Sequence, residues 1–122
     1  MDDLLKNWVT KIKENDAKQV VDLYHENALL LGTFSNIERS GKEPIFNYFK
    51  NLLQSKVDVE VVTIHEHKTN SVIAKSGLYN FIVDGKIIKA RYSFLFVKIM
   101  ENWKILSHHS SELPKSKDND NK

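Results

Sequence analysis

The sequence predicts an α+β domain in which three N-terminal helices pack on one face of a curved, mostly antiparallel sheet. Three observations support this. Up to residue 53, apolar residues recur with the helical period of 3.6, and from residue 57 onward the period is two. Midway through the second half, Asp84-Gly85 is a strong signal for a two-residue type I′ hairpin turn. The alternative is a five-stranded barrel with helical decoration, which the three helices before the strands disfavour.

The first half is expected to contain two helices, a short strand and a third helix. The first helix has an apolar stripe and ends at Asn15-Asp16, where Asp16 can cap a second helix that extends to Tyr24. The run Ala28–Leu31 is typical of a buried strand, and Pro44 suits the first turn of the third helix. The stripes of the first and third helices are Leu4, Leu5, Trp8, Val9 and Ile12, and Ile45, Tyr48, Phe49, Leu52 and Leu53.

The second half is expected to form four long antiparallel strands. Their expected ranges are Val57–His67, Ser71–Val83, Lys86–Ile99 and Trp103 to about Ser111. The Asp84-Gly85 turn sets a register in which Val83 faces Lys86, Leu78 faces Arg91 and Gly77 faces Tyr92. A second tight turn is predicted near Glu101-Asn102.

This register gives the two sheet faces different characters. One face is aromatic and is expected to pack on the helices; it includes Ile73, Gly77, Tyr79, Phe81, Ile88, Tyr92, Phe94 and Phe96. The other face mixes polar groups with Leu78, Leu95 and Val97. Half-apolar second faces often become subunit interfaces, so we predict a homo-oligomer, at least a dimer, built on this face.

Composition limits the chemistry. The 122 residues fit one domain, predicted at residues 1–114, followed by a disordered tail at residues 115–122 that has no apolar side chain. There is no cysteine, which excludes disulfides, thiolate metal sites and cysteine nucleophiles. The net charge of +2 does not indicate a nucleic-acid or membrane partner. The acidic start lacks an apolar signal segment, so we expect a cytoplasmic location.

Common catalytic motifs are missing from the sequence. It contains no glycine-rich phosphate loop, no serine nucleophile elbow and no His-Glu-x-x-His motif. His65 and His67 share one strand face, but no accompanying spacing of Asp, Glu or His supports a metal site. We therefore expect neither a metal nor a cofactor.

Three segments resemble a known family. They are Leu31-Gly32-Thr33-Phe34-Ser35-Asn36 with Arg39 and Ile45–Phe49, then Ala90–Phe94, and finally Trp103–Ser111 closing with Leu113-Pro114. Together with the order of elements, they resemble the nuclear transport factor 2-like superfamily. Within it, the chain is similar to bacterial relatives of the calcium/calmodulin-dependent protein kinase II association domain, of the SgcJ/EcaC and SnoaL-like type.

The resemblance implies a cone-shaped domain that assembles through its sheet and contains a deep polar pocket lined with basic and aromatic side chains. The kinase hub has an arginine just after the histidine that matches His109, whereas this chain has Ser110. The sequence contains neither a kinase domain nor a calmodulin-binding segment, so kinase regulation is not implied.

Seven residues are the candidates for a pocket: Arg91, His109, His108, Tyr24, Tyr48, Tyr79 and Phe34. Arg91 stands inside a strand, so it is expected to be at least partly buried, either as the anchor of an anion or in an ion pair with Glu112. His108 and His109 point to opposite faces, and a tight second turn would place His109 beside Phe94. Phe34 and Arg39 flank the predicted mouth of the cone.

The leading functional prediction is a small homo-oligomeric domain whose inner pocket binds a small polar or anionic ligand. One alternative is an acid–base enzyme of the isomerase, dehydratase or cyclase type with His109 as the base. The carboxylates expected in the strands do not lie at apolar core positions, which disfavours it. Another alternative is a purely structural oligomerisation hub. A fold by itself does not decide among these functions.

Overall fold

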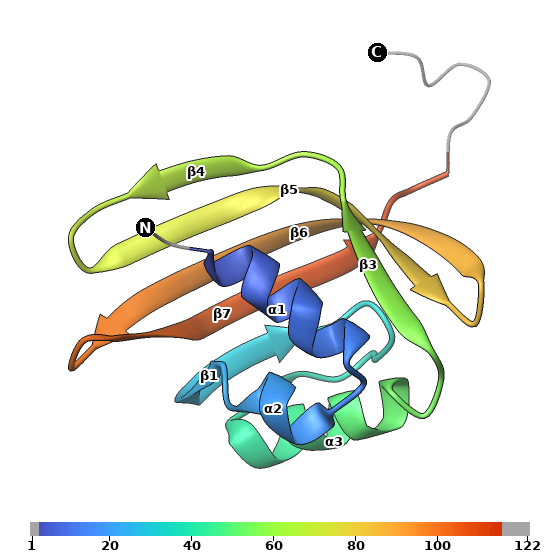
Figure 1. Cartoon of the computed structure of the whole chain (residues 1–122), viewed down its shortest axis with the longest axis horizontal. Helices are drawn as coiled ribbons and strands as arrows, with labels where there is room; N and C mark the ends of the chain where they lie inside the picture. Colours follow the sequence, from blue (N-terminus) through green and yellow to red (C-terminus); the bar gives the residue numbers. More distant parts are fainter. Residues whose placement is uncertain (1–2, 116–122) are drawn as a thin grey trace.

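The computed structural model describes residues 3–115, and these form three helices and one seven-stranded sheet (Figure 1). The helices are α1 (Leu4–Lys13), α2 (Ala17–Val21) and α3 (Lys42–Leu52). The strands are β1 (Tyr24–Leu31), β2 (Arg39–Ser40), β3 (Val57–Val61), β4 (His65–Lys68), β5 (Val72–Val83), β6 (Lys86–Ile99) and β7 (Asn102–Glu112). Apart from Lys115, the predicted tail lies outside the described residues.

The sheet is curved and open. Its strand order is β2-β1-β7-β6-β5-β3, and β4 also pairs with β5. The β1–β7 pair is parallel, and the other pairs are antiparallel. In Figure 1, α1 crosses the sheet while α2 and α3 lie beside β1. The α+β prediction is confirmed, and the open sheet rules out the barrel alternative.

The β5–β6 hairpin has the predicted register. Val83 pairs with Lys86, Leu78 with Arg91, and Gly77 with Tyr92. Asp84 and Gly85 have φ values of 50° and 85°, as a type I′ turn requires. A two-residue turn is local, so the sequence was sufficient to predict this register.

The second helix is shorter than expected, because α2 ends at Val21 and Tyr24 begins β1. The backbone N–H of Ile105 donates to the carbonyl of Leu23 at 2.9 Å, and Tyr24 pairs with Ile105. Parallel pairing with β7 therefore takes over where the helical stripe would have continued. The Asp16 cap of α2 is confirmed, since its carboxylate accepts from the N–H groups of Lys18 and Gln19.

The predicted strand Val57–His67 is divided into β3 and β4. The N–H groups of Val62 and Thr63 both donate to the carbonyl of Leu78, which is the pattern of a β-bulge. The carbonyl of Thr63 lies where a side chain at residue 77 would begin, so Gly77 makes this approach possible. The hydroxyl of Tyr92 donates to the same carbonyl at 2.8 Å.

The β6–β7 hairpin differs from the prediction in two ways. Its turn is Met100-Glu101, one residue earlier than expected, with φ values of 48° and 74°. Farther along, the register shifts between Phe96, which pairs with Ile105, and Leu95, which pairs with Ser107. The predicted turn would have placed His109 opposite Phe94, and the earlier turn by itself would place Ser107 there. The extra residue in β7 then makes His108 the partner of Phe94.

The core lies between the helices and the aromatic sheet face, as predicted. Trp8 of α1 is fully buried and stacks on Tyr79, with ring centroids 5.9 Å apart. On the sheet, Ile73, Tyr79, Phe81, Tyr92, Phe94 and Phe96 are all buried. The opposite sheet face, called the outer face below, keeps its half-apolar character, with Leu78 37% exposed.

Candidate functional site

The seven predicted site residues lie in three separate places. Tyr24, Tyr79 and His108 lie in the core, and Arg91 and His109 lie on the outer face. Phe34 and Tyr48 lie beside Arg39, at a hollow next to α3. The sequence placed all seven around one inner pocket, whereas the structure assembles no single group from them.

The core group is a chain of hydrogen bonds centred on His108. The Nδ1 atom of His108 lies 2.8 Å from the hydroxyl of Tyr24, and its Nε2 atom lies 3.2 Å from the hydroxyl of Tyr79. Trp8 Nε1 bonds to the Tyr24 hydroxyl at 3.1 Å. At the other end, the Tyr79 hydroxyl donates to Ser110 Oγ, which bonds to Thr33 Oγ1, each at 2.6 Å.

The direction of this chain follows from Tyr79, whose only hydroxyl proton is donated to Ser110 Oγ, so its oxygen must accept from Nε2 of His108. A neutral His108 then has its lone pair on Nδ1, so Tyr24 accepts from the Trp8 N–H and donates its own proton to Nδ1. We assign the proton of His108 to Nε2, where it is donated to Tyr79. Within residues 3–115, every buried side-chain nitrogen and oxygen has a partner.

Burial opposes a charge on each titratable member of this network. Desolvation, with a smaller contribution from the charge of His109, lowers the pKa of His108 from 6.5 to about 3. Desolvation also raises the pKa of the Tyr24 and Tyr79 hydroxyls well above 10. Since both nitrogens of His108 and both hydroxyls already have protein partners, these groups are not directed at a ligand.

Arg91 and His109, the outer-face group, do not lie where the sequence predicted. Arg91 was expected to be at least partly buried, and His109 was expected beside Phe94; both side chains are exposed. The cause for His109 is the extra residue in β7. Arg91 pairs with Ser111 and its Nε lies 3.4 Å from Ser111 Oγ, so it does not face Glu112.

Arg91 and His109 nevertheless lie together. They line one shallow hollow of about 210 Å³ with Tyr92, Ser93 and Ser111. No carboxylate of residues 3–115 forms an ion pair with Arg91. The hollow opens on the face predicted for self-association, and the ligand-binding role of these two residues stays a prediction.

The third group, which we call the mouth site, consists of Phe34, Arg39 and Tyr48. It borders a hollow of about 280 Å³ that Asn51 and Ser55 also line. Arg39 donates from Nε and Nη2 to Ser35 Oγ at 3.3 and 3.1 Å. Its guanidinium carbon lies 5.9 Å from the centroid of the Tyr48 ring, a cation–π arrangement.

Tyr48 is fixed in the mouth site from two sides. Its hydroxyl accepts from the backbone N–H of Phe34 at 3.2 Å, and burial raises its pKa to about 12. Gly32 lies against the same hydroxyl, and a Cβ at residue 32 would be only 2.6 Å from it. A side chain at position 32 would therefore displace the Tyr48 ring.

Arg39 is the residue that sequence reasoning underrated. It is half-buried, and no carboxylate in the described part of the chain pairs with it. The available signal was its predicted position beside the turn that precedes the third helix, between Phe34 and the stripe of Tyr48. That signal was weak because an arginine beside a turn is usually solvated, whereas Arg91 was predicted to lie well inside a long strand.

Two kinds of feature are absent from the described residues. Among residues 3–115, no group of three or more His, Asp or Glu side chains is arranged to hold a metal ion, and His65 and His67 are exposed on β4. The described chain also has no helix whose length and hydropathy would let it cross a bilayer.

Comparison with known proteins agrees with this architecture. Residues 1–116 match the SnoaL-like domain family, and the chain belongs to that family. It is similar to a structure from Xanthomonas campestris named as a candidate calcium/calmodulin-dependent protein kinase II association domain. The two share 30% identity and a TM-score of 0.87, over 93% of this chain and 85% of the other. The predicted family resemblance is confirmed.

More distant structures share the fold. A nuclear transport factor 2-like protein of unknown function from Pseudomonas putida is 11% identical, with a TM-score of 0.81 over 97% of this chain and 87% of that one. A candidate dehydratase of the same fold family from Streptomyces avermitilis is 12% identical, with a TM-score of 0.82 over 92% of each chain. No curated protein matches this chain in sequence.

Proposed function

We propose that this chain is a small self-associating binding domain whose ligand is an organic anion with a flat apolar body, such as an aromatic carboxylate. The observation that supports this most is Arg39, whose guanidinium is held in place by Ser35 and the Tyr48 ring yet has no carboxylate partner among the described residues. A planar guanidinium with free donors is suited to a carboxylate.

The rest of the mouth site fits such a ligand. Phe34 is 39% exposed and packs edge-on against Phe81, with centroids 5.1 Å apart, so its ring is both accessible and supported. Aromatic rings pack well in this way. Asn51 and Ser55 add polar groups to the lining of the hollow. A pocket with an apolar platform and few polar anchors is the usual form of a small-molecule site.

The acid–base alternative has less support. The Nδ1 lone pair of His108 already accepts from Tyr24, and its pKa of about 3 makes it a weak base at neutral pH. His109, the predicted base, is exposed on the outer face of the single chain, and no carboxylate within residues 3–115 forms an ion pair that would orient its ring. The binding proposal depends on Phe34, Arg39 and Tyr48, whose arrangement suits an aromatic carboxylate.

The test compares the two arginines, since Arg39 and Arg91 are the only ones in the sequence. Benzoate should raise the melting temperature of the wild type and of Arg91→Ala by a few degrees when present at about ten times its Kd. Arg39→Ala should lose this effect, and Arg39→Lys should lose most of it, because an ammonium lacks the planar fork. Benzyl alcohol should have no effect on any variant.

Equal stabilisation of Arg39→Ala by benzoate would refute the mouth site. Loss of the effect in Arg91→Ala instead would locate the anion at the outer-face hollow, as the sequence predicted.

A further inference from the structure

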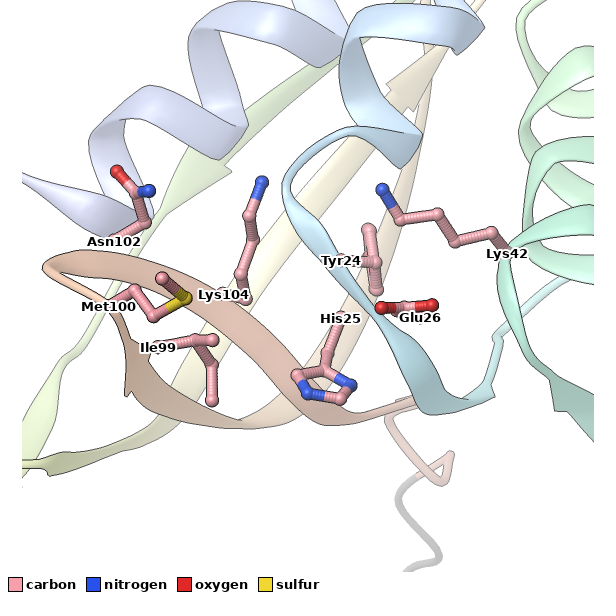
Figure 2. A pocket seen from close by; sticks show the side chains of 8 residues that line it. All are labelled: Tyr24, His25, Glu26, Lys42, Ile99, Met100, Asn102 and Lys104. Carbon is pink, nitrogen blue, oxygen red and sulfur yellow. The ribbon is translucent and has the colours of Figure 1, made fainter.

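A third hollow lies at the other end of β1, between the β6–β7 turn and the start of α3 (Figure 2). Its volume is about 360 Å³, within the range of about 300–1,000 Å³ that is usual for small-molecule sites. It shares no lining residue with the mouth site. Figure 2 shows Ile99 and Met100 on one side, with Lys42 entering from α3 on the opposite side.

Charges of both signs line this hollow. Lys42 and Lys104 contribute ammonium groups, and Glu26 contributes a carboxylate. Lys104 Nζ donates to the carbonyl of Asp22 at 2.7 Å, which holds it in place with two protons left to donate. Neither Lys42 nor Glu26 forms an ion pair with any residue in the 3–115 range. The hollow therefore offers donors for an anion and an acceptor for a cation.

His25 adds a donor to the same lining. Its Nδ1 accepts from the backbone N–H of Asn27 at 2.9 Å. A neutral His25 must then carry its proton on Nε2, which leaves an N–H free to donate.

Ile99 and Met100 form the apolar side of the hollow, and the turn that contains Met100 has an unfavourable backbone conformation. Met100 is 89% exposed and Ile99 is 43% exposed, and Met100 and Glu101 have φ values of 48° and 74°. Such φ values favour Asn and Gly, and the β5–β6 hairpin uses Asp84-Gly85 at its turn. Turn stability does not explain a methionine at this exposed position, whereas contact with an apolar group in the hollow does.

We propose that this hollow binds a small zwitterion with an apolar side chain, the chemical class of the free apolar α-amino acids. The ligand carboxylate is received by Lys42 and Lys104, and the Nε2–H of His25 is a further donor on the side of Ile99 (Figure 2). The ligand ammonium pairs with Glu26, and its side chain lies on Ile99 and Met100. An anion with an apolar tail but no ammonium would leave Glu26 unpaired beside it.

Calorimetric titration of the full chain with L-leucine and its truncated analogues tests this proposal. L-leucine should bind, and glycine, 4-methylpentanoate and 3-methylbutan-1-amine should each bind about tenfold more weakly or worse, because each lacks one of the three recognised groups. Binding of 4-methylpentanoate as tightly as leucine would overturn the zwitterion assignment. Absence of leucine binding at tens of millimolar would overturn the site.

Variants locate the binding. Lys42→Gln and Glu26→Gln should each weaken leucine binding about tenfold, while Lys50→Gln, an exposed charge elsewhere on α3, should not. Met100→Asn should weaken binding while leaving the melting temperature equal or higher, because Asn tolerates positive φ. Unchanged leucine affinity in all three hollow variants would refute the proposal. Arg39→Ala should bind leucine normally, so failure of the mouth site and failure of this one are distinguishable.

Discussion

The hydroxyl of Tyr24 lies 2.8 Å from Nδ1 of His108, and the Tyr24 oxygen also accepts from Trp8 at 3.1 Å. This pair joins α1, β1 and β7 through one continuous chain of hydrogen bonds in the core. Buried polar networks of this kind stabilise a fold only when each member has its partner and its charge state is kept. His108 must therefore stay neutral for the fold to be stable.

Acid should destabilise the protein through His108. Its folded-state pKa of about 3 lies below the ordinary value of 6.5, so as the pH falls the unfolded chain binds this proton first. The stabilisation is complete above pH 6.5 and is lost as the pH drops from 6.5 toward 3, at up to about 1.4 kcal/mol per pH unit. Urea unfolding at a series of pH values measures this slope.

Two variants assign the slope to one side chain. His108→Gln should be less stable at pH 7 and should show a shallower loss of stability below pH 6.5. His109→Gln changes the exposed neighbour and should keep the wild-type slope. If His108→Gln does not fold, NMR of the wild-type imidazoles replaces it: a His108 ring that becomes protonated near pH 6 would contradict the prediction.

Gly32→Ala should destabilise the protein by about 1–3 kcal/mol, the usual cost of overpacking. Its Cβ would lie 2.5 to 2.6 Å from the outer atoms of the Tyr48 ring. Urea unfolding measures the loss, and benzoate binding should weaken with it because Tyr48 supports Arg39. The cost should shrink in a Tyr48→Leu background, and an equal cost there would mean that the ring is not the obstacle.

Self-association should depend on the centre of the outer face. Leu95 pairs with Ala74 and Ser107 and is only partly exposed there, so a charge at this position would oppose burial against a second copy. We expect the wild type to elute as a dimer or larger and Leu95→Glu as a monomer, by light scattering coupled to size exclusion. Ile87→Glu, at an apolar position 60% exposed at the hairpin end, should leave the mass unchanged. A wild-type monomer at high micromolar concentration would refute the prediction.

Glu101→Gly should stabilise the protein by about 1 kcal/mol, because a glycine adopts positive φ without the penalty of a side chain. Glu101 has φ of 74°, and within residues 3–115 its carboxylate forms an ion pair only with Lys98, at 3.5 Å and in a largely exposed setting. Exposed ion pairs contribute little, so their loss should not cancel the gain. Thermal unfolding measures the change. A lower melting temperature would show that the turn depends on the Glu101 side chain.

The sequence was sufficient wherever a structural feature depends on near neighbours. Apolar periodicity predicted α1, α3 and the aromatic sheet face, and Asp84-Gly85 predicted the β5–β6 register residue by residue. The family resemblance rested on the same local motifs. The predictions were wrong where a segment is positioned by contacts with a distant segment. Tyr24 belongs to β1 and not to the second helix because β1 pairs with β7, and the strand predicted at Val57–His67 is interrupted where Thr63 packs against Gly77.

The positions of the candidate site residues depend most on contacts between segments that are far apart in the sequence. Side chains alternate along a strand, so one extra residue in β7 was enough to exchange His108 and His109 between the core and the outer face. The bulge that does this is not a property of the β7 sequence alone, because β7 lies between β6 and β1 and must fit both. In the same way, the sequence contains two arginines that could bind an anion, but it does not distinguish them. The tertiary structure does: Tyr48 packs against Gly32 and its buried ring lies beside Arg39, whereas Arg91 is exposed on the sheet.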